Sequence, residues 1–182
     1  MDAAQYLMQV RGYNAFSYAD VAAEVGVRKA TIHHHFPTKG DLARAVVARY
    51  RADTRAALAA IDRTTGDPRC KLERYVALYA AMLRDGPRIC LCGLLAAETP
   101  TLPDPVRAEV RGYFREHEAW LSRVLTDGVA AGALRVAGHV DVTAQLLLAS
   151  IEGAMLAARA HGDIARFDLV AAQLLATVAA AP

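Results

Sequence analysis

The sequence predicts an all-α fold, and three observations support that prediction. Apolar residues recur at helical spacing along most of the 182 residues. Glycine and proline fall between the resulting segments, as at Gly66 and Pro68 and at Gly86 and Pro87. No stretch alternates apolar and polar residues in the way that a half-buried strand requires. About nine helices are therefore expected, three in an N-terminal head and six in a larger body.

The head begins with a predicted helix over residues 1–12 and continues with a helix over 18–25. Ser17 and Asp20 have the spacing of a capping box at the start of that second helix. Its apolar face is expected to hold three residues: Val21, Ala22 and Val25. Gly26 should end the helix in a left-handed conformation, and Val27 is expected to be the buried pivot of the turn.

A third short helix is predicted over residues 28–35, before Pro37. Its inward-facing residues are expected to be Ala30, Ile32 and Phe36. Thr38 and Asp41 form a second capping box, which starts a long helix over 39–62. Two short helices around a glycine turn are a helix-turn-helix signature, and the second helix of that motif reads the DNA major groove.

These head residues resemble the DNA-binding domain of TetR-family transcriptional repressors, and the close match covers about the first fifty residues. The residues that carry the resemblance are Gly12-Tyr13, Ser17, Asp20-Val21-Ala22, Gly26-Val27, Lys29, Thr31-Ile32, His35-Phe36 and Lys39. The resemblance implies a homeodomain-like DNA-binding domain of three helices over residues 1–48. It also implies a six-helix domain for ligand binding and dimerisation over residues 49–182. Relatives usually carry a longer, often basic arm before the first helix, and if this protein has no such arm we expect some phosphate or minor-groove contact to be lost.

The charge distribution agrees with a DNA-binding head. Residues 1–51 contain seven Lys or Arg and four Asp or Glu. Residues 52–182 contain fourteen Lys or Arg and fifteen Asp or Glu. Basic charge is therefore concentrated where phosphate contacts are expected. The chain has eighteen arginines and only three lysines, yet Lys29 and Lys39 both lie in the motif, which suggests a need there for a compact, flexible cation.

Nine residues are predicted to bind DNA: Ser17, Tyr18, Arg28, Lys29, Thr31, His33, His34, His35 and Lys39. Lys29 is the first candidate for a base contact, because a lysine can donate to guanine O6 and N7. Thr31 can contact a phosphate or pack its methyl on thymine. By resemblance, His33 and His34 lie toward the DNA and His35 reaches a phosphate.

Three further points concern individual residues of the head. Arg28 replaces the small capping serine of many relatives, which loses a cap of about 1 kcal/mol and adds a cation. The three histidines point about 100° apart on a helix, so they do not chelate one metal ion, and no metal site is predicted. Tyr13 and Phe16 are expected to fill the core of the head rather than to line a ligand site.

Seven residues are candidates to line an effector pocket in the body: Met82, Leu91, Leu95, Tyr113, Phe114, His117 and Trp120. They lie in predicted helices over 69–85, 89–98 and 105–131. A methionine and aromatic stripe at this spacing is also typical of plain core. His117, one turn before Trp120, is the expected polar group, and Glu98 or Glu152 is another candidate that can equally be solvated or paired.

Cys90 and Cys92 offer a different switch. They lie near a helix N-terminus beside Arg88, which favours a thiolate and permits an electrophile or redox sensor. Free cysteine is also a common buried residue, so both cysteines can be simple core. A non-sensing architectural DNA-binding protein is a further alternative. An enzyme using Cys92, His117 and Glu98 is not expected, because no nucleophile motif, metal spacing or phosphate loop is present, and no cofactor is predicted.

Two apolar helices over residues 141–160 and 166–180 close the chain, and they are more apolar than one partner face requires. By resemblance they pair with their symmetry mates in a homodimer, which suits a palindromic operator. No uncharged apolar run of about 18 residues and no secretory signal pattern is found, so we expect no membrane partner and a cytoplasmic location.

Overall fold

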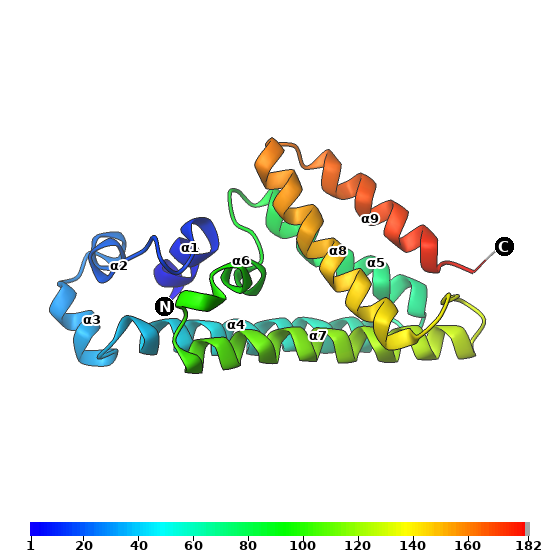
Figure 1. Cartoon of the computed structure of the whole chain (residues 1–182), viewed down its shortest axis with the longest axis horizontal. Helices are drawn as coiled ribbons and strands as arrows, with labels where there is room; N and C mark the ends of the chain where they lie inside the picture. The colour runs from blue at the N-terminus through cyan, green and yellow to red at the C-terminus, as the bar shows by residue number, and fades with distance from the viewer. Residues whose placement is uncertain (181–182) are drawn as a thin grey trace. The chain divides into compact units, whose positions relative to one another are not determined.

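In the computed structural model, residues 1–180 are described, and their regular elements are nine α-helices and one short 3-10 helix (Figure 1). This confirms the all-α prediction, and each helix starts and ends within two residues of its predicted limits. The elements in order are α1 (Asp2–Arg11), α2 (Tyr18–Val25), α3 (Lys29–His35), α4 (Lys39–Thr64), α5 (Pro68–Arg84), α6 (Leu91–Ala97), the 3-10 helix η1 (Thr99–Thr101), α7 (Asp104–Ala130), α8 (Val140–His161) and α9 (Ala165–Val178).

The chain divides into two compact units, and each is described by itself. Unit 1 contains Met1–Thr54 and Arg88–Phe114, and unit 2 contains Arg55–Pro87 together with the chain from Arg115 onward. Helices α4 and α7 each contribute residues to both units. The predicted domain boundary after residue 48 stays a prediction, because these units are assigned by contacts and not by function.

The head of unit 1 forms as its local signals predict. Ser17 and Asp20 make the full capping box at the start of α2, and Gly26 ends that helix at φ 75°. Thr38 and Asp41 make the corresponding hydrogen bonds at the start of α4. Helix α2 packs on both α1 and α3. Buried side chains that fill the head include Ala4, Leu7, Met8, Tyr13, Phe16, Val21 and Ile32.

Three predictions of inward-facing residues around the turn are wrong. Val25 is 54% exposed and Val27 is 39% exposed, so neither is a buried pivot. Ala30 is exposed as well. The physical reason is the small size of the head, because short helices bury only one narrow stripe each. On α3 that stripe is taken by Ile32, and Ala30 lies two residues away, about 200° around the helix.

A carboxylate from the second segment of unit 1 holds the turn after α1. Glu98, just after α6, accepts hydrogen bonds from the backbone N–H groups of Tyr13 and Asn14 at 2.5 and 3.1 Å. The Asn14 side chain donates to Glu98 at 2.9 Å and to Thr101 at 2.8 Å. Gly12 has φ 85° and ψ 176°, a conformation open almost only to glycine. A Cβ at Gly12 would also lie 2.7 Å from the Glu98 carboxylate, so the close approach requires glycine.

Unit 2 is built on packing among α5, α8 and α9, and α8 and α9 run side by side (Figure 1). Its core includes Phe167 at 0% exposure and Ile151 and Met155 at 1%. On its surface Arg84 of α5 donates to both carboxylate oxygens of Asp168 on α9 at 2.8 Å. Helix α8 is long and apolar enough to cross a membrane by length and composition alone. In the structure α8 packs on α5 and α9, and 39% of its apolar window is buried.

We predict that Gly12→Ala lowers the free energy of unfolding by about 3 kcal/mol, because backbone strain adds to displacement of the Glu98 carboxylate. Gly26→Ala is the matched control. Gly26 also has positive φ, but nothing lies within 4 Å of a Cβ there, so a loss of about 1 kcal/mol is expected. Urea denaturation measures both. Equal losses for the two variants would contradict the role assigned to Glu98, as would full additivity of Gly12→Ala with Glu98→Ala.

Candidate nucleic-acid interface

Helix α3 presents one buried residue to the head and a polar surface to solvent. Ile32 is buried, whereas Lys29, Thr31, His33, His34 and His35 are all exposed. Arg28 is the N-cap, and its side chain makes no capping hydrogen bond. No Asp or Glu occurs between Val25 and Gly40. The exposed face of α3 is therefore free of carboxylates that would repel phosphate.

A shallow hollow of ≈ 390 Å³ lies on this face of α3. Its lining residues are Arg28, Ala30, Thr31 and His34. Three of these four belong to the predicted DNA-binding set, so the structure brings them together on one surface. The fourth is Ala30, which was predicted to face the core and is exposed on this surface. Its angular position on the helix, opposite Ile32, explains that exposure.

Tyr18 lies below this surface and not on it. It is 6% exposed, and its hydroxyl donates to the Phe36 carbonyl at 2.6 Å. Its ring meets the His33 ring edge-on at a centroid distance of 4.3 Å. Burial, with the nearby Asp41 carboxylate, raises the pKa of Tyr18, so the hydroxyl stays a donor. Tyr18 thus holds the end of α3 and orients His33.

Ser17 and Lys39 flank α3. The Ser17 hydroxyl is used in capping α2, donating to Asp20 at 2.6 Å. Lys39, at the first turn of α4, places its ammonium 4.5 Å from the Tyr13 ring centroid and 4.6 Å from that of Phe16. Burial lowers the pKa of Lys39, and the Glu98 carboxylate opposes that shift. The two rings fix the direction of this cation at the edge of the head.

The three histidines do not converge on one point. The His34 and His35 rings lie 5.3 Å apart at 73°, while His33 packs on Tyr18. Across residues 1–180, no three His, Cys, Asp or Glu side chains gather in a way that would hold a metal ion. The exposed imidazoles are therefore hydrogen-bonding groups of the α3 surface.

The predicted effector-binding residues divide between the two units. In unit 1, Leu91 and Leu95 are buried and Tyr113 is 1% exposed. Tyr113 stacks on Tyr50 with centroids 5.8 Å apart, and Phe114 meets Tyr113 edge-on. These residues supply an apolar and aromatic environment.

In unit 2, His117 joins two tyrosines in a buried cluster. The Tyr75 and Tyr79 hydroxyls lie 3.0 and 3.3 Å from His117 Nδ1 and 3.0 Å from each other. Trp120 stacks on Tyr75 at 5.3 Å, and Met82 is half-buried. Burial lowers the pKa of His117 to about 4, so the ring is neutral at neutral pH. The cluster is a buried polar network rather than a charged one.

Asp62, which the sequence-based prediction missed, anchors this aromatic group. It accepts from Trp120 Nε1 at 3.0 Å and pairs with Lys71 at 2.9 Å and Arg123 at 3.6 Å. Burial opposes ionisation of Asp62, but the Lys71 and Trp120 hydrogen bonds outweigh it and lower its pKa. The position of Trp120 is therefore set by a carboxylate as well as by ring stacking.

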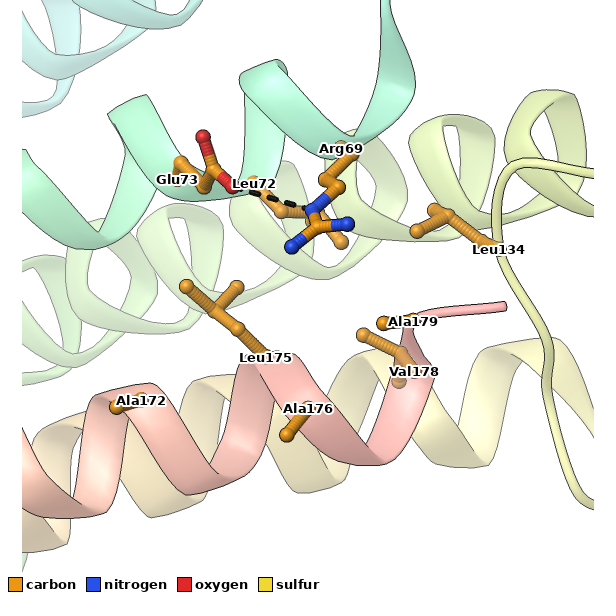
Figure 2. Close-up of a pocket in the computed structure, with 9 residues that line it drawn as sticks. All are labelled: Arg69, Leu72, Glu73, Leu134, Ala172, Leu175, Ala176, Val178 and Ala179. Carbon is orange, nitrogen blue, oxygen red and sulfur yellow. Dashed lines mark hydrogen bonds and ion pairs between the residues drawn. The ribbon is translucent and has the colours of Figure 1, made fainter. Parts of the chain in front are cut away.

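Unit 2 also has a hollow of ≈ 230 Å³ between α5 and α9, and none of the predicted effector-binding residues lines it. Figure 2 shows Leu175 and Val178 of α9 facing the α5 residues Arg69 and Leu72 across it. Arg69 and Glu73 pair along the α5 side at 3.3 Å. Its lining residues are Arg69, Leu72, Glu73, Leu134, Ala172, Leu175, Ala176, Val178 and Ala179.

Comparison with known proteins gives consistent matches to one family. Residues 1–46 match the model for bacterial regulatory proteins of the tetR family, and residues 68–174 match the tetracyclin repressor-like C-terminal domain. A crystal structure of a TetR-family transcriptional regulator from Agrobacterium tumefaciens is 40% identical, with a TM-score of 0.96 over 98% of this chain and 95% of that one.

Two further relatives are less similar. The TetR transcriptional regulator from Legionella pneumophila is 27% identical, with a TM-score of 0.88 over 97% of this chain and 94% of that one. The HTH-type transcriptional repressor DhaR from Mycobacterium sp. (strain GP1) is 27% identical over 147 residues. That match covers 80% of this chain and 73% of the relative.

We predict that the low pKa of His117 makes the folded state less stable in acid. The folded imidazole takes up a proton near pH 4 and the unfolded one near pH 6.5, so protons favour the unfolded state as the pH falls between these values. The free energy of unfolding should fall by about 2 kcal/mol between pH 7 and pH 5 through this group. Urea denaturation at both pH values should show a smaller fall in His117→Gln. His161→Gln, at an exposed position, is the control; an unchanged fall in His117→Gln would refute the assignment.

Proposed function

Because this chain belongs to the TetR family of DNA-binding transcriptional regulators, we propose that it represses transcription from a near-palindromic operator and is released by a small apolar or aromatic effector. The family is one of non-enzymatic regulators, which confirms the prediction that the chain is not an enzyme. Repression is supported by the relative from Mycobacterium, which is named a repressor. The matched family is one of bacterial regulatory proteins, and binding to a chromosomal operator requires the cytoplasmic location that we propose.

The observation that carries this proposal is the exposed face of α3. Arg28, Lys29 and His34 project from a surface that is anchored underneath by Ile32. Seven residues of helix rise about 10 Å, which suits entry into a major groove about 12 Å wide. Lys29 and Arg28 supply donors for guanine or phosphate. Ser17, His35 and Lys39 lie at the flanks, where backbone phosphates would pass.

Dimerisation is supported by an apolar stripe on unit 2. Helix α8 exposes Val142 at 59%, Leu146 at 60% and Leu156 at 44%, spaced along one face. Helix α9 adds Leu169 at 72% exposure and Val170 at 41%. Side chains of this size exposed together mark an interaction surface. A second copy of the chain is the proposed occupant, since a twofold dimer matches a palindromic operator.

We propose an apolar or aromatic effector because the residues predicted to line its pocket are mostly apolar or aromatic. Leu91, Leu95, Tyr113 and Phe114 supply aliphatic and ring surface, and His117 and Trp120 supply rings with polar atoms. Release of DNA requires only that the effector bind one conformation of the heads better than the other. We propose that α4 carries this coupling, because its first turn belongs to the head and its last turns to unit 2.

A cysteine switch is less well supported by the geometry. Cys90 and Cys92 are 1% and 0% exposed, which denies access to an oxidant or electrophile in this conformation. Cys90 caps α6 by accepting from Gly93 N–H and donates to the Tyr113 hydroxyl at 3.3 Å. These contacts are those of a structural residue. Loss of operator binding after thiol alkylation, absent in a Cys90→Ser and Cys92→Ser double variant, would favour the switch instead.

We predict that Lys29→Ala weakens operator binding by about 1–3 kcal/mol and relaxes base preference at one position of each half-site. Fluorescence anisotropy across a salt series, with the upstream region of its own gene as the first probe, measures the affinity. Arg63→Ala removes one cation from the last turn of α4, outside the head, and is the control. A loss that is uniform across sequences would make Lys29 a phosphate contact, and no loss would remove it from the interface.

We predict that Leu169→Glu abolishes the dimer, because it places a carboxylate in the apolar stripe. Sedimentation at micromolar concentration should give a monomer, and operator affinity should fall at least tenfold, because one half-site is then lost. Leu78→Glu, on the exposed side of α5, is the control and should stay dimeric. A dimeric Leu169→Glu variant would place the interface elsewhere.

A further inference from the structure

We infer that Ala30 determines base specificity, and that the hollow on α3 receives the C5-methyl group of a thymine in each operator half-site. This inference rests on the proposed function, because it takes α3 to be the helix that enters the major groove. It goes beyond that function by assigning a base identity to one residue. Four observations on α3 lead to it.

The first observation is angular position. Successive residues of an α-helix are about 100° apart, so positions 30 and 34 each lie about 200° from position 32. Ile32 is buried against the head. Ala30 and His34 therefore point away from the head more directly than any other residue of α3. Where α3 approaches the DNA bases most closely, Ala30 and His34 are therefore the residues that contact them.

The second observation is the shape of the surface. The hollow of ≈ 390 Å³ is lined by two long side chains, Arg28 and His34, and two short ones, Ala30 and Thr31. Ala30 and Thr31 are shorter than Arg28 and His34 and so leave space between these two side chains. Alanine offers only a methyl group there, and threonine offers a methyl and a hydroxyl. Ala30 thus contributes only apolar surface to the hollow, beside the mixed surface of Thr31.

The third and fourth observations decide the occupant. Among the major-groove edges of DNA bases, only thymine presents a methyl group. No Asp or Glu occurs between Val25 and Gly40, and the Ala30 methyl itself neither donates nor accepts a hydrogen bond. The amino group of cytosine, or the polar edge of guanine or adenine, would therefore gain no partner from Ala30 when it lies directly over that methyl. The rim residues Arg28 and His34 supply donors that suit the phosphates or guanine beside that thymine.

The test begins with selection of bound duplexes from random DNA by the full-length protein. The selected half-site should contain an invariant thymine. Deoxyuridine, which lacks only the methyl group, is then placed at each thymine in turn. We expect one position per half-site at which deoxyuridine weakens binding about fourfold, and about 16-fold when both half-sites are changed, from the burial of one methyl-sized group each.

Protein variants identify the residue that reads this methyl group. Ala30→Gly removes the methyl under the base and should bring the thymine-to-deoxyuridine ratio close to one, whatever its effect on overall affinity. Ala30→Val adds two methyl groups at the place where the thymine methyl is expected, and should reverse the ratio in favour of deoxyuridine. His161→Gln, far along the sequence, should keep the fourfold ratio. Because each ratio compares two DNAs on one protein, any loss of helix stability cancels.

The outcomes separate the two proposals. If no duplex is selected, the proposed function fails. If a specific duplex is selected but no thymine responds to loss of its methyl group, the function stands and this inference is overturned. It is also overturned if the fourfold ratio persists in both Ala30→Gly and Ala30→Val.

Discussion

The arrangement of the head depends on one carboxylate. Glu98 accepts from two successive backbone N–H groups, those of Tyr13 and Asn14, and so fixes the turn between α1 and α2. Such charge-assisted bonds are stronger than those between neutral groups. This turn also positions Tyr13 and Phe16, and the Lys39 ammonium lies over both of their rings. A single residue, 85 positions after Tyr13 and 84 after Asn14, therefore helps to position the DNA-binding head.

The surface of α3 depends on that framework through one buried side chain and one hydroxyl. Ile32 ties the helix to the head, and Tyr18 binds the carbonyl of Phe36 at its end. A helix of seven residues is too short to be stable alone, so these contacts decide which of its faces meets solvent. The exposure of Arg28, Lys29 and His34 to solvent therefore follows from this anchoring as well as from the polarity of their side chains.

Unit 2 shows a different balance between polar and apolar contacts. Its interior contains the Tyr75, Tyr79 and His117 cluster and the Asp62 carboxylate that binds Trp120. Its outer helices α8 and α9 leave Leu146 and Leu169 exposed. A buried polar network gives specificity to a core, whereas an exposed apolar stripe favours association. Both properties suit the effector binding and the pairing with a second copy that are proposed for this unit.

The amino-acid sequence by itself determined the fold class, the helix limits and the capping residues, since these depend on contacts within a few residues. Ser17 with Asp20, and Gly26 at positive φ, were predicted for that reason. Only the tertiary structure decided which residues face outward: Val25, Val27 and Ala30 were expected inside and are exposed. It also decided the partners of Glu98 and Asp62, because hydrogen bonds between residues far apart in the chain follow from packing and leave no periodic signal in the sequence.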